Sequence, residues 1–224
     1  MCGRYTVLTE DEIIEVREIL SELSLRIVRD EFNDYDEESA YSGGTGEVFP
    51  TNRAPVVTRH DEGVAFESCK WGFRKWNSPG VIINARCESL RSKRSFSRYL
   101  ETGRCVVPAG EFFEWGMAAG ADSAGKKKHY AKDREGNLLF MAGLYRDVRD
   151  ENGAGMIREF VIITKEATGE MARIHDRMPV LLRVDQIEPW LTGRLTPEDL
   201  EKLEYDVVVN PCEDGGADIQ ISLF

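Results

Sequence analysis

A chain of 224 residues with 42% apolar residues can build one sizeable hydrophobic core, and we expect a single domain over 1–224. Its 29 basic and 40 acidic residues give a formal charge of −11, which argues against a non-specific nucleic-acid binder but not against a local basic surface. The five cysteines form no CxxC pair, so we expect reduced thiols, no structural zinc and no metal or cofactor.

The first expected element is a helix over 9–23, because Thr9 and Glu12 have capping-box spacing and apolar residues follow at helical intervals. Residues 29–50 are polar, acidic and glycine-bearing, which is typical of a long surface loop. Strands are then expected at 54–58, 63–76, 80–88, 104–115 with a break at 108–110, 129–133, 137–148, 158–167 and 206–209, with short helices at 92–103, 185–191 and 196–203.

Two further segments complete the expected order of elements. Residues 116–129 are interpreted as a hairpin connection, and residues 168–183 as a short helix, a turn and a strand. Many β segments with short helices between them, and no regular β–α alternation, indicate an α+β protein. We expect a mostly antiparallel, barrel-like β-sheet core with short flanking helices.

Four positions carry chemistry-bearing residues that also have an ordinary structural interpretation. Asn84, within an apolar strand, could satisfy buried backbone groups, and Glu114, which alternates with aromatic residues, could face solvent. His175 could lie at a helix end or turn, and Cys2 could be a small residue near the terminus. Taken one at a time, these residues assign no function.

Taken together, five motifs in order resemble those of the SRAP family, the SOS-response-associated peptidases. They are MCGRY, WGF, INARCES, RCVVPAGEFFEW and IHDRMPV, and they span residues 1 to 183. The resemblance implies the SRAP fold and a protein that detects abasic sites in single-stranded DNA. It also implies a covalent DNA–protein crosslink through the N-terminal cysteine, once Met1 has been removed. Among the cysteines, Cys2 matches that crosslinking residue.

The resemblance assigns further residues one by one. Asn84, Glu114 and His175 match the family's catalytic asparagine, glutamate and histidine. Three residues match DNA-binding positions: Arg4, Arg86 and Trp71. This sequence departs from the family pattern at GEFFEW, at GFRKW and at Cys87, where a serine is common. Without the resemblance, Trp71 and Trp76 would both be interpreted as core residues.

The chemistry explains why a cysteine follows Met1. An abasic site opens to an aldehyde, which a primary amine attacks to give a Schiff base. Only an N-terminal cysteine places a thiol on the same residue as the amine, so that the thiol adds to the imine and closes a thiazolidine ring. An α-amine titrates near 7.7–8.0, well below a lysine, so a useful fraction is neutral in the cell.

The other residues take roles in the same scheme. Glu114 would move protons between the amine and the leaving water, and His175 would assist sugar opening. Asn84 would hold the N-terminal segment or the sugar. Arg4 and Arg86 would bind DNA phosphates through their guanidinium groups. A solvated helix face would explain the cluster of basic residues over 70–104 as well as a phosphate-binding track does, but its position beside the NAR motif favours the track. Its members are Lys70, Arg74, Lys75, Arg86, Arg91, Lys93, Arg94, Arg98 and Arg104.

Two other functions remain open from the sequence. The first is a thiol peptidase acting on other proteins, with Cys2 as nucleophile and His175 as base. The second is a non-covalent reader of modified DNA bases. Removal of Met1 could be autoproteolytic, or a methionine aminopeptidase could perform it. With no apolar leader and no run of about 18 apolar residues, we expect a monomeric protein without membrane contact, cytoplasmic and located at the nucleoid when bound to DNA.

Overall fold

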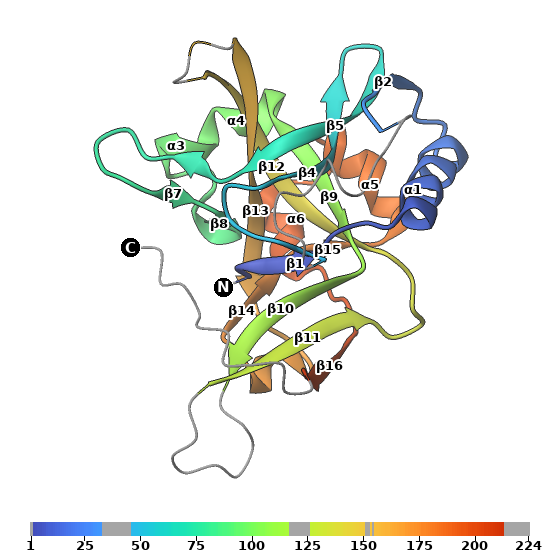
Figure 1. Ribbon diagram of the computed structural model, residues 1–224, viewed down its shortest axis with the longest axis vertical. Helices are drawn as coiled ribbons and strands as arrows, with labels where there is room; N and C mark the ends of the chain where they lie inside the picture. Colours follow the sequence, from blue (N-terminus) through green and yellow to red (C-terminus); the bar gives the residue numbers. More distant parts are fainter. Residues whose placement is uncertain (1, 33–45, 117–125, 151–152, 154, 213–224) are drawn as a thin grey trace.

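The computed structural model describes residues 2–32, 46–116, 126–150, 153 and 155–212 (Figure 1). It shows an α+β fold around a nine-stranded sheet, in which most neighbouring strands are antiparallel. Seven of its strands follow one another in the order β14 (Arg177–Pro179), β13 (Met156–Glu166), β12 (Leu139–Arg149), β9 (Arg104–Ala109), β4 (Arg53–His60), β5 (Gly63–Trp71) and β2 (Ile27–Asp30). Two short strands complete the sheet: β15 (Leu181–Leu182) pairs with β12, and β8 (Asn84–Arg86) pairs with β13.

A parallel pairing closes this sheet into a barrel. Strand β13 pairs with β12 on one side and with β5 on the other, where Phe160 lies opposite Trp71. The ring therefore runs β5, β4, β9, β12, β13 and back to β5. Closure removes the exposed edges that an open sheet would leave. The expected barrel-like α+β core is confirmed.

A second sheet of five strands covers one end of the barrel, at the bottom of Figure 1. Its order is β16 (Val207–Pro211), β11 (Lys127–Asp133), β10 (Glu111–Gly116), β1 (Arg4–Thr6) and β3 (Glu47–Val48). Buried side chains of both sheets form one apolar cluster, which includes Cys2, Tyr5 and Phe112 of the N-terminal region and this sheet, and Trp71 and Phe160 of the barrel. The N-terminal strand β1, a member of the small sheet, thereby packs against the barrel.

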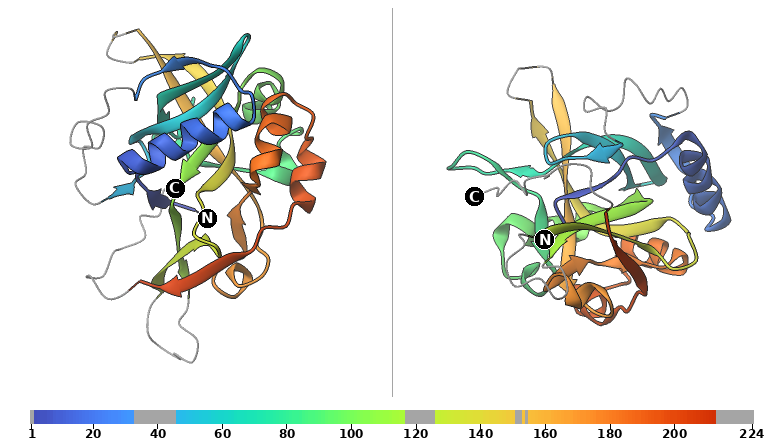
Figure 2. Two further views of the ribbon diagram at one scale, coloured as in Figure 1. Left: turned by 90° about the vertical axis from the view of Figure 1, so that its right-hand side faces the viewer. Right: turned by 60° about the horizontal axis from the view of Figure 1, so that its bottom comes forward.

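The helices lie outside the barrel. They are α1 (Glu10–Glu22), α3 (Arg94–Ser97), α4 (Tyr99–Thr102), α5 (Val184–Leu191) and α6 (Pro197–Lys202), with short 3₁₀ turns at Cys87–Ser89 and Met171–Arg173. The left view of Figure 2 shows α1 in front of the barrel, with α5 and α6 beside it. None of the helices in the described part of the chain is long and apolar enough to cross a membrane.

The first helix forms as its sequence predicts. Thr9 Oγ1 accepts the backbone N–H of Glu12 at 3.3 Å, and the Glu12 carboxylate accepts the Thr9 N–H at 2.7 Å, which completes the capping box. Ile13, Val16 and Leu20 are buried against the barrel. The order of the other helices and strands along the chain also largely agrees with the expected one.

Several expected elements are divided differently in the structure. The strand expected at 63–76 stops at Trp71, because Gly72 has a φ of +112° and starts a separate hairpin of β6 (Phe73–Arg74) and β7 (Val81–Ile82). The helix expected at 92–103 is two short helices. Strands β2 and β3 lie within or beside the loop expected at 29–50, whose residues 33–45 are outside the described part, as are 117–125 of the expected hairpin connection.

Candidate functional site

The N-terminal segment is held in the interior of the protein. Strand β1 pairs with β10 so that Arg4 lies opposite Phe113 and Tyr5 opposite Phe112. The preceding residue, Cys2, has no exposed surface. Its carbonyl oxygen accepts a hydrogen bond from Asn84 Nδ2 at 2.8 Å, although the two residues are 82 positions apart. The cysteine backbone therefore has a fixed position in the core.

Asn84 connects the N-terminus to the barrel wall. Strand β8 lies parallel to β13, with Asn84 opposite Ile162. The indole of Trp71 supports this strand, since its Nε1 donates to the carbonyl of the neighbouring Ile83 at 3.1 Å. The Oδ1 atom of Asn84 is buried and has no hydrogen-bond partner among the described residues. A buried polar atom left without a partner is unusual and is suited to binding a ligand hydroxyl.

Glu114 lies inside the protein, at 1% exposure, in the middle of β10. Alternation along the strand places it on the same face as Phe112, toward the core. Burial raises the pKa of its carboxyl to about 6, and the positive charge of the amino terminus partly offsets this. Burial likewise raises the pKa of the Cys2 thiol, and the Glu114 carboxylate raises it further. The thiol and the carboxylate are therefore within electrostatic reach of each other.

His175 enters the site from a different element. It follows the 3₁₀ turn at Met171–Arg173, and this segment touches the end of β10, where a Cβ on Gly116 would lie 2.6 Å from the Ile174 carbonyl. Only a glycine fits at that contact. The charge of Asp176 contributes to the raised pKa of Glu114, as expected for neighbouring groups. The structure thus brings the segment that carries His175 to the Gly116 end of β10, two residues beyond Glu114.

The protonation of His175 follows from its contacts. Its Nδ1 accepts the Arg177 backbone N–H at 2.9 Å, and Asp176 Oδ1 lies 2.8 Å from the same nitrogen. The first contact needs a lone pair on Nδ1, whereas the second favours a proton there. Burial lowers the pKa of the imidazole. We therefore assign the neutral ring, with its proton on Nε2.

The three expected DNA contacts have different surroundings. Arg86 is exposed at the end of β8. Arg4 is largely buried, with its guanidinium 4.4 Å from the Phe49 ring centre and 3.5 Å from a Glu47 oxygen. Trp71 has no exposed surface and packs against Tyr5 and Phe160. Its indole cannot touch a bound strand, so the expectation of direct contact is wrong for this structure, and Trp71 supports Ile83 instead.

The exposed tryptophan is Trp76. It lies between β6 and β7 and is 97% exposed. The interpretation of Trp76 as a core residue is therefore wrong. The sequence held a usable signal, because Trp76 precedes the turn-forming NSPG segment. A turn at 77–80 places the preceding residue near the hairpin tip, whereas Trp71 continues a buried strand.

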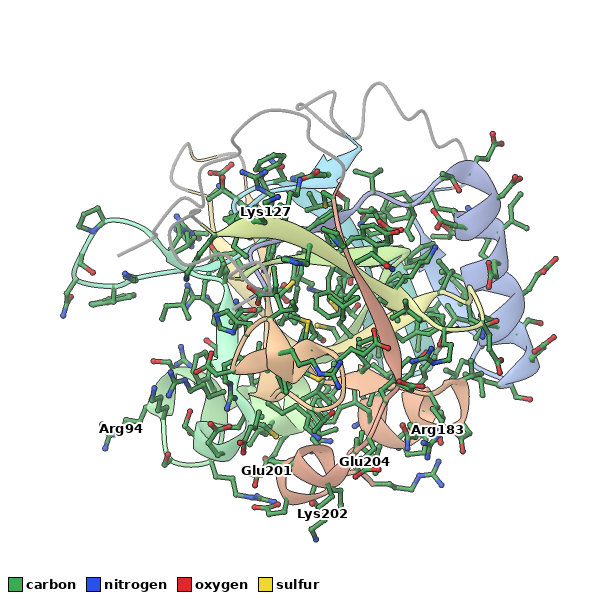
Figure 3. The ribbon with its side chains drawn as sticks, turned by 90° about the horizontal axis from the view of Figure 1, so that it is seen from below. Arg94, Lys127, Arg183, Glu201, Lys202 and Glu204 are labelled. Carbon is green, nitrogen blue, oxygen red and sulfur yellow. The ribbon has the colours of Figure 1, made fainter. Side chains whose placement is uncertain are left out.

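Only part of the expected basic track is available to phosphates. Arg74 pairs with buried Glu159 at 2.7 Å, and Arg91 pairs with Glu198 at 2.7 Å. Arg104 is buried and donates to main-chain carbonyls, including that of Leu195 at 2.6 Å. Besides Arg91, the exposed cations of the track are Arg86, Lys93, Arg94 and Arg98. Figure 3 shows Arg94 pointing away from the body of the protein.

The burial of Glu114 leads to a prediction about stability. The folded state keeps the proton to a pH of about 6, whereas the unfolded chain releases it near 4.5, so native stability falls as the pH rises through this window. A shift of this size costs about 2 kcal/mol at neutral pH. Glu114→Gln should therefore unfold with a higher free energy than the parent above pH about 6 and lose that advantage near pH 4. Denaturant titrations at several pH values measure this, and a constant difference would contradict it.

Comparison with known proteins places these features in a family. The family described as SOS response associated peptidase (SRAP) matches residues 1–214. The abasic site processing protein YoqW of Bacillus subtilis is 31% identical over 205 residues, covering 89% of this chain and 84% of YoqW. YedK of Escherichia coli, another abasic site processing protein, is 26% identical over 207 residues, covering 91% and 85%.

A relative that is matched over a shorter segment, and two solved structures, give the same picture. The abasic site processing protein HMCES of Gallus gallus is 34% identical over 124 residues, covering 48% of this chain and 37% of HMCES. A crystal structure from Bacteroides thetaiotaomicron superposes with a TM-score of 0.70 at 20% identity, covering 95% and 93% of the two chains. A phage-related protein of Bordetella bronchiseptica gives a TM-score of 0.66 at 24% identity, covering 95% of each chain. This chain belongs to the SOS response associated peptidase family.

Proposed function

We propose that this protein processes abasic sites in single-stranded DNA by forming a covalent thiazolidine crosslink through Cys2, after removal of Met1. The observation that carries the proposal is the position of Cys2, which is buried next to Glu114 with its carbonyl held by Asn84. The names of the relatives YoqW, YedK and HMCES, all abasic site processing proteins, support the substrate.

The reaction joins two bond-forming steps on one residue. The α-amine of Cys2 attacks the aldehyde carbon of the open abasic sugar, and the carbinolamine loses water to form an imine. The thiol then adds across the C=N bond, forming a C–S bond while its proton ends on the nitrogen. One water is lost overall and nothing is oxidised. Because burial raises the pKa of the Cys2 thiol, the sulfur must lose its proton as the C–S bond forms, and the imine nitrogen receives that proton.

Glu114 is suited to both proton transfers of imine formation. With a pKa of about 6 it is mostly ionised at neutral pH and can take a proton from the ammonium. Because the pKa is close to neutrality, the protonated acid can also return a proton to the departing hydroxyl. The neutral imidazole of His175 can assist opening of the sugar ring, and Asn84 Oδ1 can accept a hydrogen bond from a sugar hydroxyl.

The DNA strand would run over the exposed cations near Arg86. Arg86, Lys93, Arg94 and Arg98 are exposed on β8 and on or beside α3. Trp76, 97% exposed on its hairpin, offers an aromatic face on which an unpaired base can stack. Positive charge and an exposed aromatic ring together are the usual features of a single-strand binding surface.

The environment of Cys2 does not favour the peptidase interpretation. A thiol peptidase needs a thiolate, which neighbouring positive charge normally stabilises. Here burial and the Glu114 carboxylate both raise the pKa of the Cys2 thiol. No observation favours a non-covalent reader of modified bases over a crosslinking protein.

Incubation with an abasic single-stranded oligonucleotide, followed by denaturing gel electrophoresis, tests the proposal. We expect a heat-stable band of lower mobility that contains both protein and DNA. An identical oligonucleotide with an intact base is the control and should give no such band. Hydrolysis of a protein substrate without this band, or retardation seen only in native gels, would contradict the proposal.

A further inference from the structure

Glu47 lies between two cations of the small sheet. Its carboxylate accepts a hydrogen bond from Lys128 Nζ through Oε1 and lies 3.5 Å from Arg4 Nη1 through Oε2. The strand register brings these three side chains together, because Glu47 lies opposite Thr6 of β1 and Lys128 lies opposite Trp115 of β10. Residues from β1, β3 and β11 therefore converge around one carboxylate.

Aromatic rings hold the two cations in place. The Arg4 guanidinium lies 4.4 Å from the Phe49 ring centre and 5.1 Å from that of Trp115. Lys128 Nζ lies 4.4 Å from the Phe113 ring centre and 5.9 Å from that of Trp115. The side chains of Arg4 and Lys128 are only 8% and 15% exposed. Cations fixed over aromatic rings at low exposure form a preorganised anion site.

The site lies next to the reactive residue, since Arg4 follows Cys2 by two positions. We propose that Arg4 and Lys128 bind a backbone phosphate beside the abasic nucleotide, and that Glu47 occupies this site in the DNA-free protein as a substitute for the phosphate. The inference rests on the proposed function. It adds Lys128 as a phosphate contact and makes Glu47 a residue that DNA must displace.

The arrangement predicts that Glu47 weakens DNA binding. A carboxylate a few ångströms from an incoming phosphate repels it, and the repulsion is stronger where the local dielectric constant is lower. Glu47→Gln keeps the shape and removes the charge, so its affinity for an unreactive abasic analogue should rise by about 5- to 50-fold. Lys128→Ala should weaken binding and make its salt dependence shallower by about one phosphate contact.

Glu111→Gln is the matched control. It removes the same charge from β10, in the same sheet, and should change affinity by less than about twofold. The double variant Glu47→Gln/Lys128→Ala should show a smaller gain than Glu47→Gln shows alone, because both residues act on one phosphate. Thermal melts of each variant show whether the fold is retained.

Affinity and crosslinking are measured separately, so the two proposals can fail independently. Affinity is measured with an unreactive abasic analogue, and crosslinking with a true abasic oligonucleotide. A tighter Glu47→Gln variant of a protein that forms no crosslink would support the phosphate site and contradict the proposed function. A parent that crosslinks, with Glu47→Gln no tighter than Glu111→Gln in a folded protein, would overturn the phosphate site.

Discussion

Glu114→Gln is expected to slow crosslinking by about 10²–10⁴-fold while it leaves the affinity for an unreactive abasic analogue within about twofold. The amide has nearly the same shape as the carboxyl but cannot exchange protons with the amine and the departing water. Because Glu114 is buried inside the site rather than on its rim, its main contribution is to the reaction and not to DNA capture.

Single-turnover crosslinking on a true abasic site, at saturating protein, measures the first quantity, and native-gel affinity for the analogue measures the second. Glu111→Gln, three residues earlier on the same strand, is the control and should react at the parental rate. A Glu114→Gln variant that binds poorly but reacts normally once saturated would show that Glu114 is a binding or structural residue.

Cys2→Ser is expected to abolish the heat-stable crosslink. Serine keeps the α-amine, so the imine can still form, but its hydroxyl is a much weaker nucleophile than a thiol and does not close the ring. Borohydride reduction should therefore trap a conjugate from Cys2→Ser that heat would otherwise release. Denaturing gels with and without borohydride measure both species.

Cys212→Ser is the matched control, because Cys212 is the one described cysteine with appreciable exposure. It should crosslink like the parent. A heat-stable crosslink from Cys2→Ser at the parental level would exclude Cys2. Cys87 would then be the next residue to test, although it is buried, with its thiol donating to the Pro197 carbonyl.

Local sequence patterns predicted local structure well. The capping box of Thr9 and Glu12 gave the start of α1, and the break near Gly110 separates β9 from β10 as expected. These features depend on residues a few positions apart. Closure of the barrel by β13 and β5 depends on residues about 90 positions apart, which no local pattern reports.

The candidate site shows the same division. The family motifs named Cys2, Asn84 and Glu114, but only the structure shows that Asn84 holds the Cys2 carbonyl. Alternation along β10 left two faces for Glu114, because aromatic residues flank it on both sides and both faces are largely buried. The choice between them was made by packing against the barrel.

The largest error concerned tryptophan and arginine exposure. Trp71 was expected at the DNA and is buried, while Trp76 is exposed on the hairpin. Arg74 and Arg104 were expected in a phosphate track and are held by Glu159 and by main-chain carbonyls. Composition shows that cations cluster along a segment. It does not show which of them a distant carboxylate or carbonyl already occupies.

The most direct test of the central claim is mass spectrometry of the crosslinked protein after protease and nuclease digestion. We expect the DNA remnant on the peptide that begins at Cys2, with Met1 absent, at the sum of the two masses less one water. Both the amine and the thiol of that residue should resist reagents specific for each. A remnant on a lysine or on another cysteine, or a crosslinked peptide that retains Met1, would contradict it.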